Sequence, residues 1–219
     1  MYLPAHFEER RPEVLQRLVR EHPLGLLVTQ GDSGLQANPI PFLLDADAGG
    51  GPGTLVAHVA RANPVWREAR TDIESLVVFQ GPQAYISPSL YPSKAATGKV
   101  VPTWNYVMVQ ARGRLRVVDD TDWLRTLVTR LTARHEAARV APWKVEDAPA
   151  DYVESMLRAI VGIEIRLNAL SGKWKVSQNR SPADRAGVVR GLLKQAGRGA
   201  DPQAAAIAAW VPQDGATPG

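Results

Sequence analysis

The apolar residues of this chain follow two kinds of pattern. Apolar residues that recur every three or four positions indicate helices with one buried face, whereas short apolar runs bounded by Gly, Pro, Asn or Asp indicate strands. By these criteria the predicted helices cover 13–21, 63–69, 121–139, 151–160 and 182–196. The predicted strands cover 24–29, 35–44, 54–59, 74–80 with a continuation over 84–87, 104–118 and 163–170.

Proline and glycine positions refine this pattern. Pro39 and Pro41 have no N–H to donate, so the strand 35–44 is expected at a sheet edge or in an irregular ladder. The glycine-rich segment 48–53 lacks the spacing and the following helix of a dinucleotide-binding loop, and it predicts a hairpin tip. Residues 90–103 are expected to form a long loop.

Strands joined mostly by hairpin turns, with helices between the later ones, predict an α+β fold built on an antiparallel sheet. A sheet of this size can close into a small barrel. The chain has no internal repeat, and we expect one domain over residues 1–196 with a helical insertion over 120–161. The Ala-, Gly- and Pro-rich segment 197–219 is expected to be a poorly ordered tail.

The amino-acid composition limits the kinds of functional site that the chain can form. The chain has no cysteine, which excludes disulfides, thiolate metal sites and a Cys nucleophile, and its four histidines lack metal-ligand spacing. The net charge of +4 suits a phosphate-bearing ligand but is weaker than in a dedicated nucleic-acid domain. Residues 1–9 have no apolar signal core, and no apolar run is long enough to span a membrane. A cytoplasmic protein without a metal site is the expectation.

The most informative stretch is 172–180, with the sequence GKWKVSQNR. It places three cations, a hydroxyl, two amides and an indole within nine positions. Lys and Arg donors with a hydroxyl suit a phosphate, and an indole suits a flat ring, so a flavin nucleotide is the economical interpretation. If the segment is extended, Lys173, Lys175 and Ser177 share one face, and the apolar residues between them pack on the other. A basic surface loop is the alternative.

Two further segments carry candidate ligand groups. Arg61 precedes a predicted helix whose N-cap is Asn63, where an anion is favoured; a capped helix with a solvated arginine is the alternative interpretation. His58, just upstream, is more often a packed, hydrogen-bonded histidine than a ligand. Ser87 and Ser89 lie on a proline-stiffened loop, which either orders a ligand or is simply a turn-rich connection.

The segment 101–106, VPTWNY, places Thr103, Trp104 and Asn105 at a strand start. The aromatic and amide groups can stack on or hydrogen-bond a heterocycle, although they can equally fill a core. The chain contains no GxSxG motif, no P-loop and no convincing helix-turn-helix. Catalytic residues therefore stay unknown, and the sequence leaves open whether the protein is an enzyme.

Several motifs in consistent order resemble the PaiB family, whose members are FMN-binding negative transcriptional regulators with a split β-barrel. Leu90 stands where the family more often has an aromatic residue, and the tail has no recognised counterpart. The resemblance implies a homodimer with two FMN sites where the protomers meet. The motifs that carry it are MYLP at 1–4 with Phe7, HVARANPVW at 58–66, YISPSLY at 85–91, VPTWNY at 101–106, GKWKVSQNR at 172–180 and Asp184-Arg185.

The resemblance also implies roles for individual residues. The phosphate candidates are Arg61, Ser87, Lys173 and Lys175. The candidates for the ring or ribityl chain are Thr103, Trp104, Asn105, Gln178 and Asn179. The remaining cofactor-binding candidates are His58, Asn63, Ser89 and Ser177.

Three functions remain as hypotheses. The first is an FMN-binding, flavin- or redox-responsive repressor with DNA as a partner, whether contacted directly or not. The second is a small FMN-dependent oxidoreductase, similar to flavin reductases, that uses a nicotinamide or another reductant. The third is haem binding, for which His58 or His135 would have to be the axial ligand.

Overall fold

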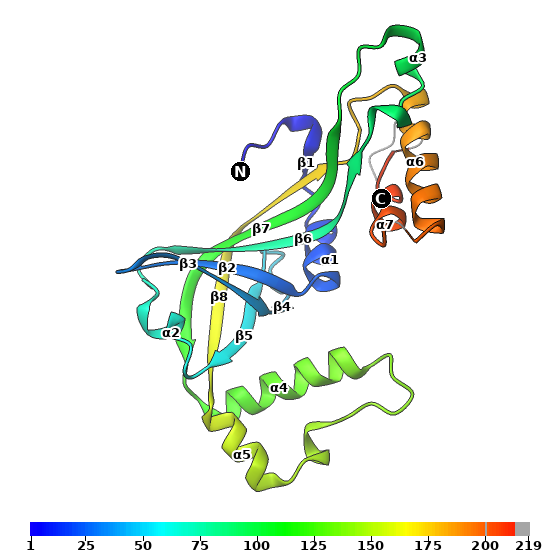
Figure 1. Cartoon of the computed structure of the whole chain (residues 1–219). Helices are drawn as coiled ribbons and strands as arrows, with labels where there is room; N and C mark the ends of the chain where they lie inside the picture. Colours follow the sequence, from blue (N-terminus) through cyan, green and yellow to red (C-terminus); the bar gives the residue numbers. More distant parts are fainter. Residues whose placement is uncertain (200, 213–219) are drawn as a thin grey trace. The chain divides into compact units, whose positions relative to one another are not determined.

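The computed structural model describes residues 1–199 and 201–212, which fall into two compact units (Figure 1). Unit 1 comprises Met1–Leu18, Gln80–Val109 and Ser171–Gly219, and unit 2 comprises Val19–Phe79 and Gln110–Leu170. The strands are β1 Glu8–Glu9, β2 Leu24–Gly31, β3 Gly34–Pro41, β4 Leu43–Asp45, β5 Thr54–Ala60, β6 Glu74–Ile86, β7 Thr103–Val118 and β8 Ile160–Lys175. The helices are η1 Ala5–Phe7, α1 Pro12–Glu21, α2 Val65–Glu68, η2 Pro88–Leu90, α3 Ser93–Thr97, α4 Thr121–Glu136, η3 Val145–Asp147, α5 Ala150–Arg158, α6 Pro182–Gly197 and α7 Ala204–Ala208.

The strands form one sheet in the order β3-β2-β6-β7-β8-β5-β4, with β1 added to β8. The pairs β2–β3, β2–β6, β4–β5, β5–β8 and β1–β8 are antiparallel. The path ends at β3 and β4, so the sheet does not close on itself. The predicted α+β class with an antiparallel split-barrel sheet is confirmed. The long strands β6, β7 and β8 each contribute residues to both units.

The segment predicted as one strand over 35–44 is two strands. Pro41 ends β3, which pairs with β2 along its length from Gly34 to Pro41. Phe42 then donates its N–H to the Pro23 carbonyl, and β4 pairs with β5 instead of β2. The chain changes partner where the proline lacks a donor. The prediction that the proline-containing strand lies at an edge is confirmed.

The segment between β7 and β8 in unit 2 contains α4 and α5. Asp120 caps α4 by accepting the N–H of Trp123, and the helix ends at Glu136, three residues before the predicted end. Leu127 and Leu131 pack in a cluster with Leu43. The helix α4 is therefore anchored through the apolar face that the helical period predicts. Leu124 joins a second cluster with Val145, Val153 and Leu157.

In unit 1, α6 packs closely against η2. A Cβ added at Gly187 would come within 2.2 Å of the Leu90 carbonyl oxygen, so only glycine permits this approach. Asp184 accepts hydrogen bonds from the backbone N–H and the hydroxyl of Ser93, which ties the start of α3 to α6. The helix α3 lies inside the segment predicted as a loop.

The expected poorly ordered tail does not hold for residues 201–212. These residues contain α7, and Ala204, Ile207, Ala208 and Val211 are buried. Their spacing of three, one and three positions is helical, so burying one apolar face orders this segment despite its Ala-rich composition. Residues 213–219 of the predicted tail lie outside the described residues.

Within the described part of the chain, no helix has the length and apolar character needed to cross a bilayer.

Candidate functional site

Two lysines at the end of β8 form the centre of the candidate site in unit 1. Lys173 is buried, donates from Nζ to the Tyr2 carbonyl at 3.0 Å, and lies 5.5 Å from the Tyr106 ring centroid. Lys175 donates from Nζ to the Thr103 hydroxyl and to the Trp104 carbonyl. These contacts join the segments 101–106 and 172–180, whose shared role in binding a cofactor stays a prediction.

The lysine charges are not neutralised by protein carboxylates. Among the described residues, neither Lys173 nor Lys175 takes part in an ion pair. Burial, together with the nearby charges of Lys173 and Arg180, lowers the pKa of Lys175. A bound anion would relieve this repulsion and raise that pKa.

The segment after Lys175 is a turn, so the condition that residues 173–177 be extended is not met. Ser177 adopts a φ of 66° and is buried against Asn105, which donates from Nδ2 to the Ser177 hydroxyl at 2.9 Å. Gln178 closes the turn, because Oε1 accepts the Val176 N–H at 2.8 Å and Nε2 donates to the Trp174 carbonyl. A serine is held in the left-handed region by these surrounding hydrogen bonds. Ser177 therefore does not share the face of the two lysines.

A groove of about 450 Å³ adjoins the lysines and is lined by Gln80, Gln83, Trp104, Tyr106 and Met108. The Trp104 side chain is 52% exposed, which makes it available to a ligand. Its carbonyl accepts from Lys175, and the Tyr106 ring lies beside Lys173, so cations and groove meet at these two aromatic residues. Sequence reasoning missed Gln80 and Gln83, since nothing in the strand pattern distinguishes them from other surface amides. Trp104 also meets Tyr85 edge to face, with ring centroids 6.0 Å apart.

The predicted serines lie elsewhere in unit 1. The Ser87 hydroxyl caps η2 by accepting the Ser89 N–H, and the Ser89 hydroxyl accepts from Lys94 Nζ, both at 3.2 Å. No hydrogen bond among the described residues joins either serine to Lys173 or Lys175. Their assignment to the cofactor stays a prediction.

The two residues that follow Gln178 differ in their surroundings. Asn179 is exposed, and its side chain makes no hydrogen bond within the described part of the chain. The Arg180 guanidinium lies over the Tyr91 ring, 4.8 Å from its centroid. Asn179 is thus the amide of this segment that remains available to a ligand.

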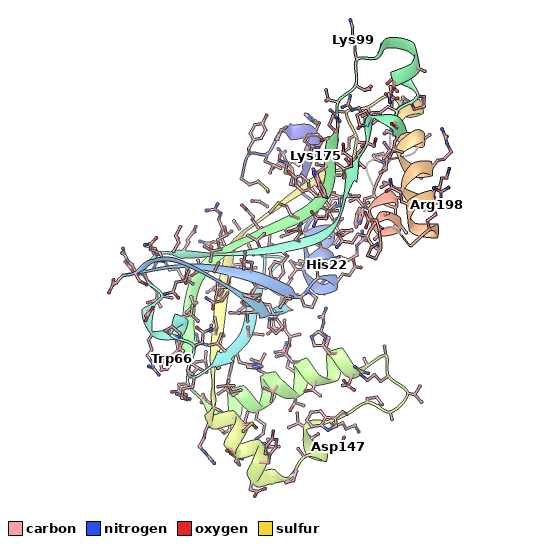
Figure 2. All side chains as sticks on the ribbon, viewed as in Figure 1. His22, Trp66, Lys99, Asp147, Lys175 and Arg198 are labelled. Carbon is pink, nitrogen blue, oxygen red and sulfur yellow. The ribbon has the colours of Figure 1, made fainter. Side chains whose placement is uncertain are left out.

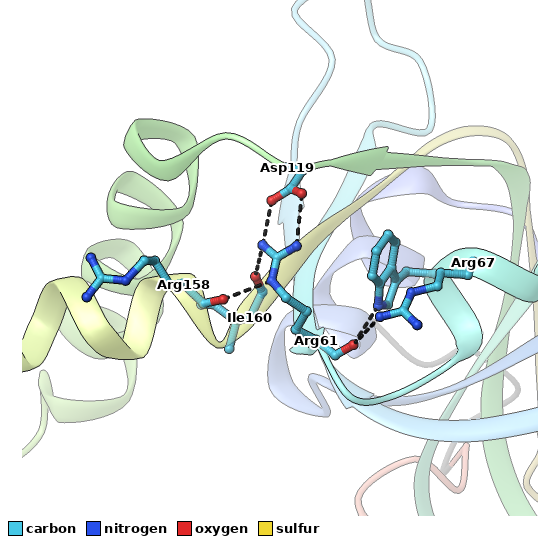
Figure 3. A network of polar contacts seen from close by, with 6 residues as sticks. Arg61, Arg67, Asp119, Arg158 and Ile160 are labelled. Atoms are coloured by element: carbon cyan, nitrogen blue, oxygen red, sulfur yellow. Dashed lines mark hydrogen bonds and ion pairs between the residues drawn. The ribbon is translucent and has the colours of Figure 1, made fainter.

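Arg61 belongs to unit 2 and occupies a structural network (Figure 3). Its guanidinium donates to both carboxylate oxygens of Asp119, at 2.9 and 2.6 Å, and to the carbonyls of Arg158 and Ile160. The hydrogen bonds between the two side chains, together with their opposite charges, raise the pKa of Arg61 and lower that of Asp119. A phosphate at Arg61 would have to displace this carboxylate, so the geometry favours the structural interpretation of this arginine.

The N-cap of α2 is Pro64 rather than the predicted Asn63, whose Oδ1 accepts the Val65 N–H at 3.0 Å. The Nδ2 of Asn63 donates to Asn38, so both ends of this amide are engaged within unit 2. His58 lines an apolar pocket of about 420 Å³ in unit 2, where its buried Nδ1 has no hydrogen-bond partner among the described residues. Burial lowers the pKa of His58, which favours the neutral ring. The second haem-ligand candidate, His135, is exposed on α4.

Comparisons with known proteins show the family of the chain. Residues 1–169 match the FMN_bind_2 family, described as a putative FMN-binding domain. The chain is 38% identical over 226 residues to the uncharacterized protein AN0679 of Emericella nidulans, covering 88% of this chain and 90% of that protein. It is 32% identical over 197 residues to the protease synthase and sporulation protein PAI 2 of Bacillus subtilis, covering 89% and 90%.

Two solved structures share the fold. The first is the FAD and heme binding protein from Mycobacterium smegmatis, with a TM-score of 0.55 and 18% identity; the match covers 77% of this chain and 73% of that one. The second is the flavocytochrome Anf3 from Azotobacter vinelandii, with a TM-score of 0.55 and 12% identity; the match covers 77% of this chain and 69% of that one.

The open antiparallel sheet and its structural likenesses place the protein in the split-barrel class to which flavin-binding proteins belong. Within that class, the chain belongs to the FMN_bind_2 family, and its predicted relation to PaiB is confirmed.

Proposed function

We propose that the chain binds FMN in unit 1, with the phosphate near Lys173 and Lys175 and the ring in the groove beside Trp104. The observation that carries this proposal is a pair of lysines with no carboxylate partner among the described residues, beside an aromatic groove. An anion offsets the repulsion among buried cations, and aromatic side chains offer a flat apolar contact for a ring.

The donor set fits each part of such a ligand. Lys175 and the hydroxyl of Thr103 are already within hydrogen-bond reach of each other, so a phosphate can be met by both with little rearrangement. The amides of Gln80 and Gln83 line the groove and suit the polar edge of an isoalloxazine. When bound, the flavin supplies electron or hydride transfer, while these residues hold and orient it.

The biological role that we propose is negative transcriptional regulation in response to flavin or its redox state. This role is supported by family membership and by relatedness to PAI 2, whose name refers to protease synthase and sporulation. We further propose a homodimer in which the exposed aromatic pair Tyr85 and Trp104 lies near the partner protomer, because large exposed aromatics are typical of interface cores.

A second candidate is a small flavin-dependent oxidoreductase, which the exposed groove at Trp104 favours, because a ring bound there would stay accessible to a second reactant. Anaerobic mixing of the FMN-loaded protein with NADH or NADPH distinguishes the two. Rapid bleaching of the flavin absorbance would support the oxidoreductase, and an oxidised flavin that persists would count against it for these two reductants.

The visible absorbance spectrum of the purified protein, before and after FMN is added and the excess removed, tests the proposal directly. A retained two-band flavin spectrum at one FMN per chain is expected. A protein that retains no FMN would overturn the proposed site.

A further inference from the structure

The charges of the two units differ in sign. Unit 1 contains 12 Lys and Arg against 6 Asp and Glu, whereas unit 2 contains 14 against 16. The segment Gln80–Val109 contains no acidic residue at all. The mild net charge of the whole chain therefore conceals a clearly basic unit 1.

The cations of the two units also differ in their partners. Six ion pairs lie in unit 2, and they engage arginines on several of its elements. In the described part of unit 1, the two ion pairs involve only Arg10 and Arg11. The exposed cations of α3, α6 and their flanks have no carboxylate partner among the described residues; they are Lys94, Lys99, Arg190, Lys194 and Arg198.

Three of these cations form a line along α6. Arg190 and Lys194 are exposed and four residues apart, and Arg198, also exposed, follows four residues later at the C-cap of the helix. Each step is about 6 Å along the helix axis, so the three charges follow one face. The opposite face is fixed in place, because Val188 and Leu192 are fully buried.

Lys94 extends this line beyond the helix. It shares with Arg190 a pocket of about 620 Å³, which contains no carboxylate. The hydrogen bonds from Ser93 to Asp184 hold α3 against α6 and so fix the two cations on one surface. Figure 2 shows Lys99 on the loop that carries α3 and Arg198 toward the other end of α6.

We propose that Lys94, Arg190, Lys194 and Arg198, named here the α6 basic stripe, bind the phosphate backbone of double-stranded DNA. The inference rests on the proposed regulatory function and assigns it a surface. A linear row of unpaired cations matches a linear row of phosphates, and such contacts position a protein without reading the base sequence. The stripe therefore supplies affinity for duplex DNA of any sequence.

Fluorescence anisotropy with a labelled random-sequence duplex, measured at several salt concentrations, tests the stripe. The variant Arg190→Gln/Lys194→Gln/Arg198→Gln is compared with Arg112→Gln/Arg114→Gln/Arg166→Gln, which removes three exposed charges from unit 2. The slope of log affinity against log salt should become shallower by about 0.9 for each phosphate that the first variant no longer neutralises, and should change little in the second variant.

Each other outcome overturns the proposal in a distinguishable way. If the wild-type protein binds duplex DNA but both variants keep its salt slope, or both change the slope equally, the protein binds DNA directly but not through the α6 basic stripe. If the wild-type protein binds no duplex at low salt, both the stripe and the direct form of the regulatory function fail. If the α6 variant loses binding only to anionic lipid vesicles, the partner is wrong. Retention of FMN by both variants verifies that they are folded.

Discussion

At the scale of single residues, Lys175 shows how the same side chain acquires its chemistry from its neighbours. The sequence places it in a cation-rich segment, but its contacts with Thr103 and Trp104 follow only from the pairing of β7 with β8. Arg61 is the opposite case, because its motif resembles a phosphate site and the fold pairs it with Asp119. In both cases the partner is far away in the sequence.

Replacing Lys175 with Gln should weaken FMN binding by about 10- to 100-fold, which corresponds to about 1.5–3 kcal/mol for a hydrogen bond to a charged group. Riboflavin, which lacks the phosphate, should lose far less affinity. Flavin fluorescence titration measures both, with Lys99→Gln as a control that removes one exposed charge from the same unit. An equal loss for the two ligands would contradict the phosphate assignment.

The lowered pKa of Lys175 also predicts a pH dependence. The phosphate prefers the protonated amine, so FMN affinity should fall as pH rises from the lowered pKa of the free protein to the higher pKa of the complex. The stability of the free protein should show the opposite trend. The unfolded chain holds the Lys175 proton more tightly than the folded protein, so the free energy of unfolding rises with pH between the lowered pKa and the ordinary pKa of lysine.

Titrations of FMN and riboflavin at a series of alkaline pH values check this prediction, because ionisation of the shared ring affects both ligands. The fall specific to FMN should disappear in Lys175→Gln. A fall that persists in this variant would assign the titration to another group.

At the scale of elements, helices with a long apolar period and capped ends were predicted well, as in α1, α4 and α6. The elements that the sequence did not predict correctly are short. The helix α3 is held by Asp184, and α7 is held by burial of its apolar face, so tertiary contacts decide whether either segment forms. Isolated helices of this length are not stable in water.

Two glycines of α6 should respond to replacement by alanine with opposite changes in stability. Gly187→Ala should destabilise the protein by about 1–3 kcal/mol, because the added methyl group meets the Leu90 carbonyl oxygen. Gly197→Ala should be neutral or stabilising by up to about 1 kcal/mol, since nothing lies within 4 Å of the added Cβ and alanine favours the helix. Urea denaturation measures both variants. Equal stabilities would show that α6 and η2 are not closely packed.

At the scale of the whole molecule, the two units carry different chemistry. Unit 1 holds the lysines, the aromatic groove and the basic stripe, whereas six of the 14 cations of unit 2 are in ion pairs with carboxylates. The flavin and DNA proposals therefore both fall on unit 1.

The proposed dimer predicts that Tyr85→Glu shifts the protein toward the monomer. A charge placed in an aromatic interface would be desolvated without a partner. Tyr152→Glu is the matched control, because Tyr85 is 48% and Tyr152 is 56% exposed. Sedimentation velocity should give a mass of about twice 23.8 kDa for the wild-type protein and the control. A dimer that persists in Tyr85→Glu would place the interface elsewhere.

The amino-acid sequence by itself determined the antiparallel α+β class and the principal helices, and it pointed to the segments that we propose as ligand-binding. These features are local, since they depend on apolar period, caps and turn residues within one segment. Only the tertiary structure decided that Lys175 meets Thr103, that Ser177 turns inward to Asn105, and that Arg61 is paired with Asp119. Each of these contacts joins residues more than 50 positions apart. Periodicity along the chain depends on nearby residues only, so it cannot identify partners at such a separation.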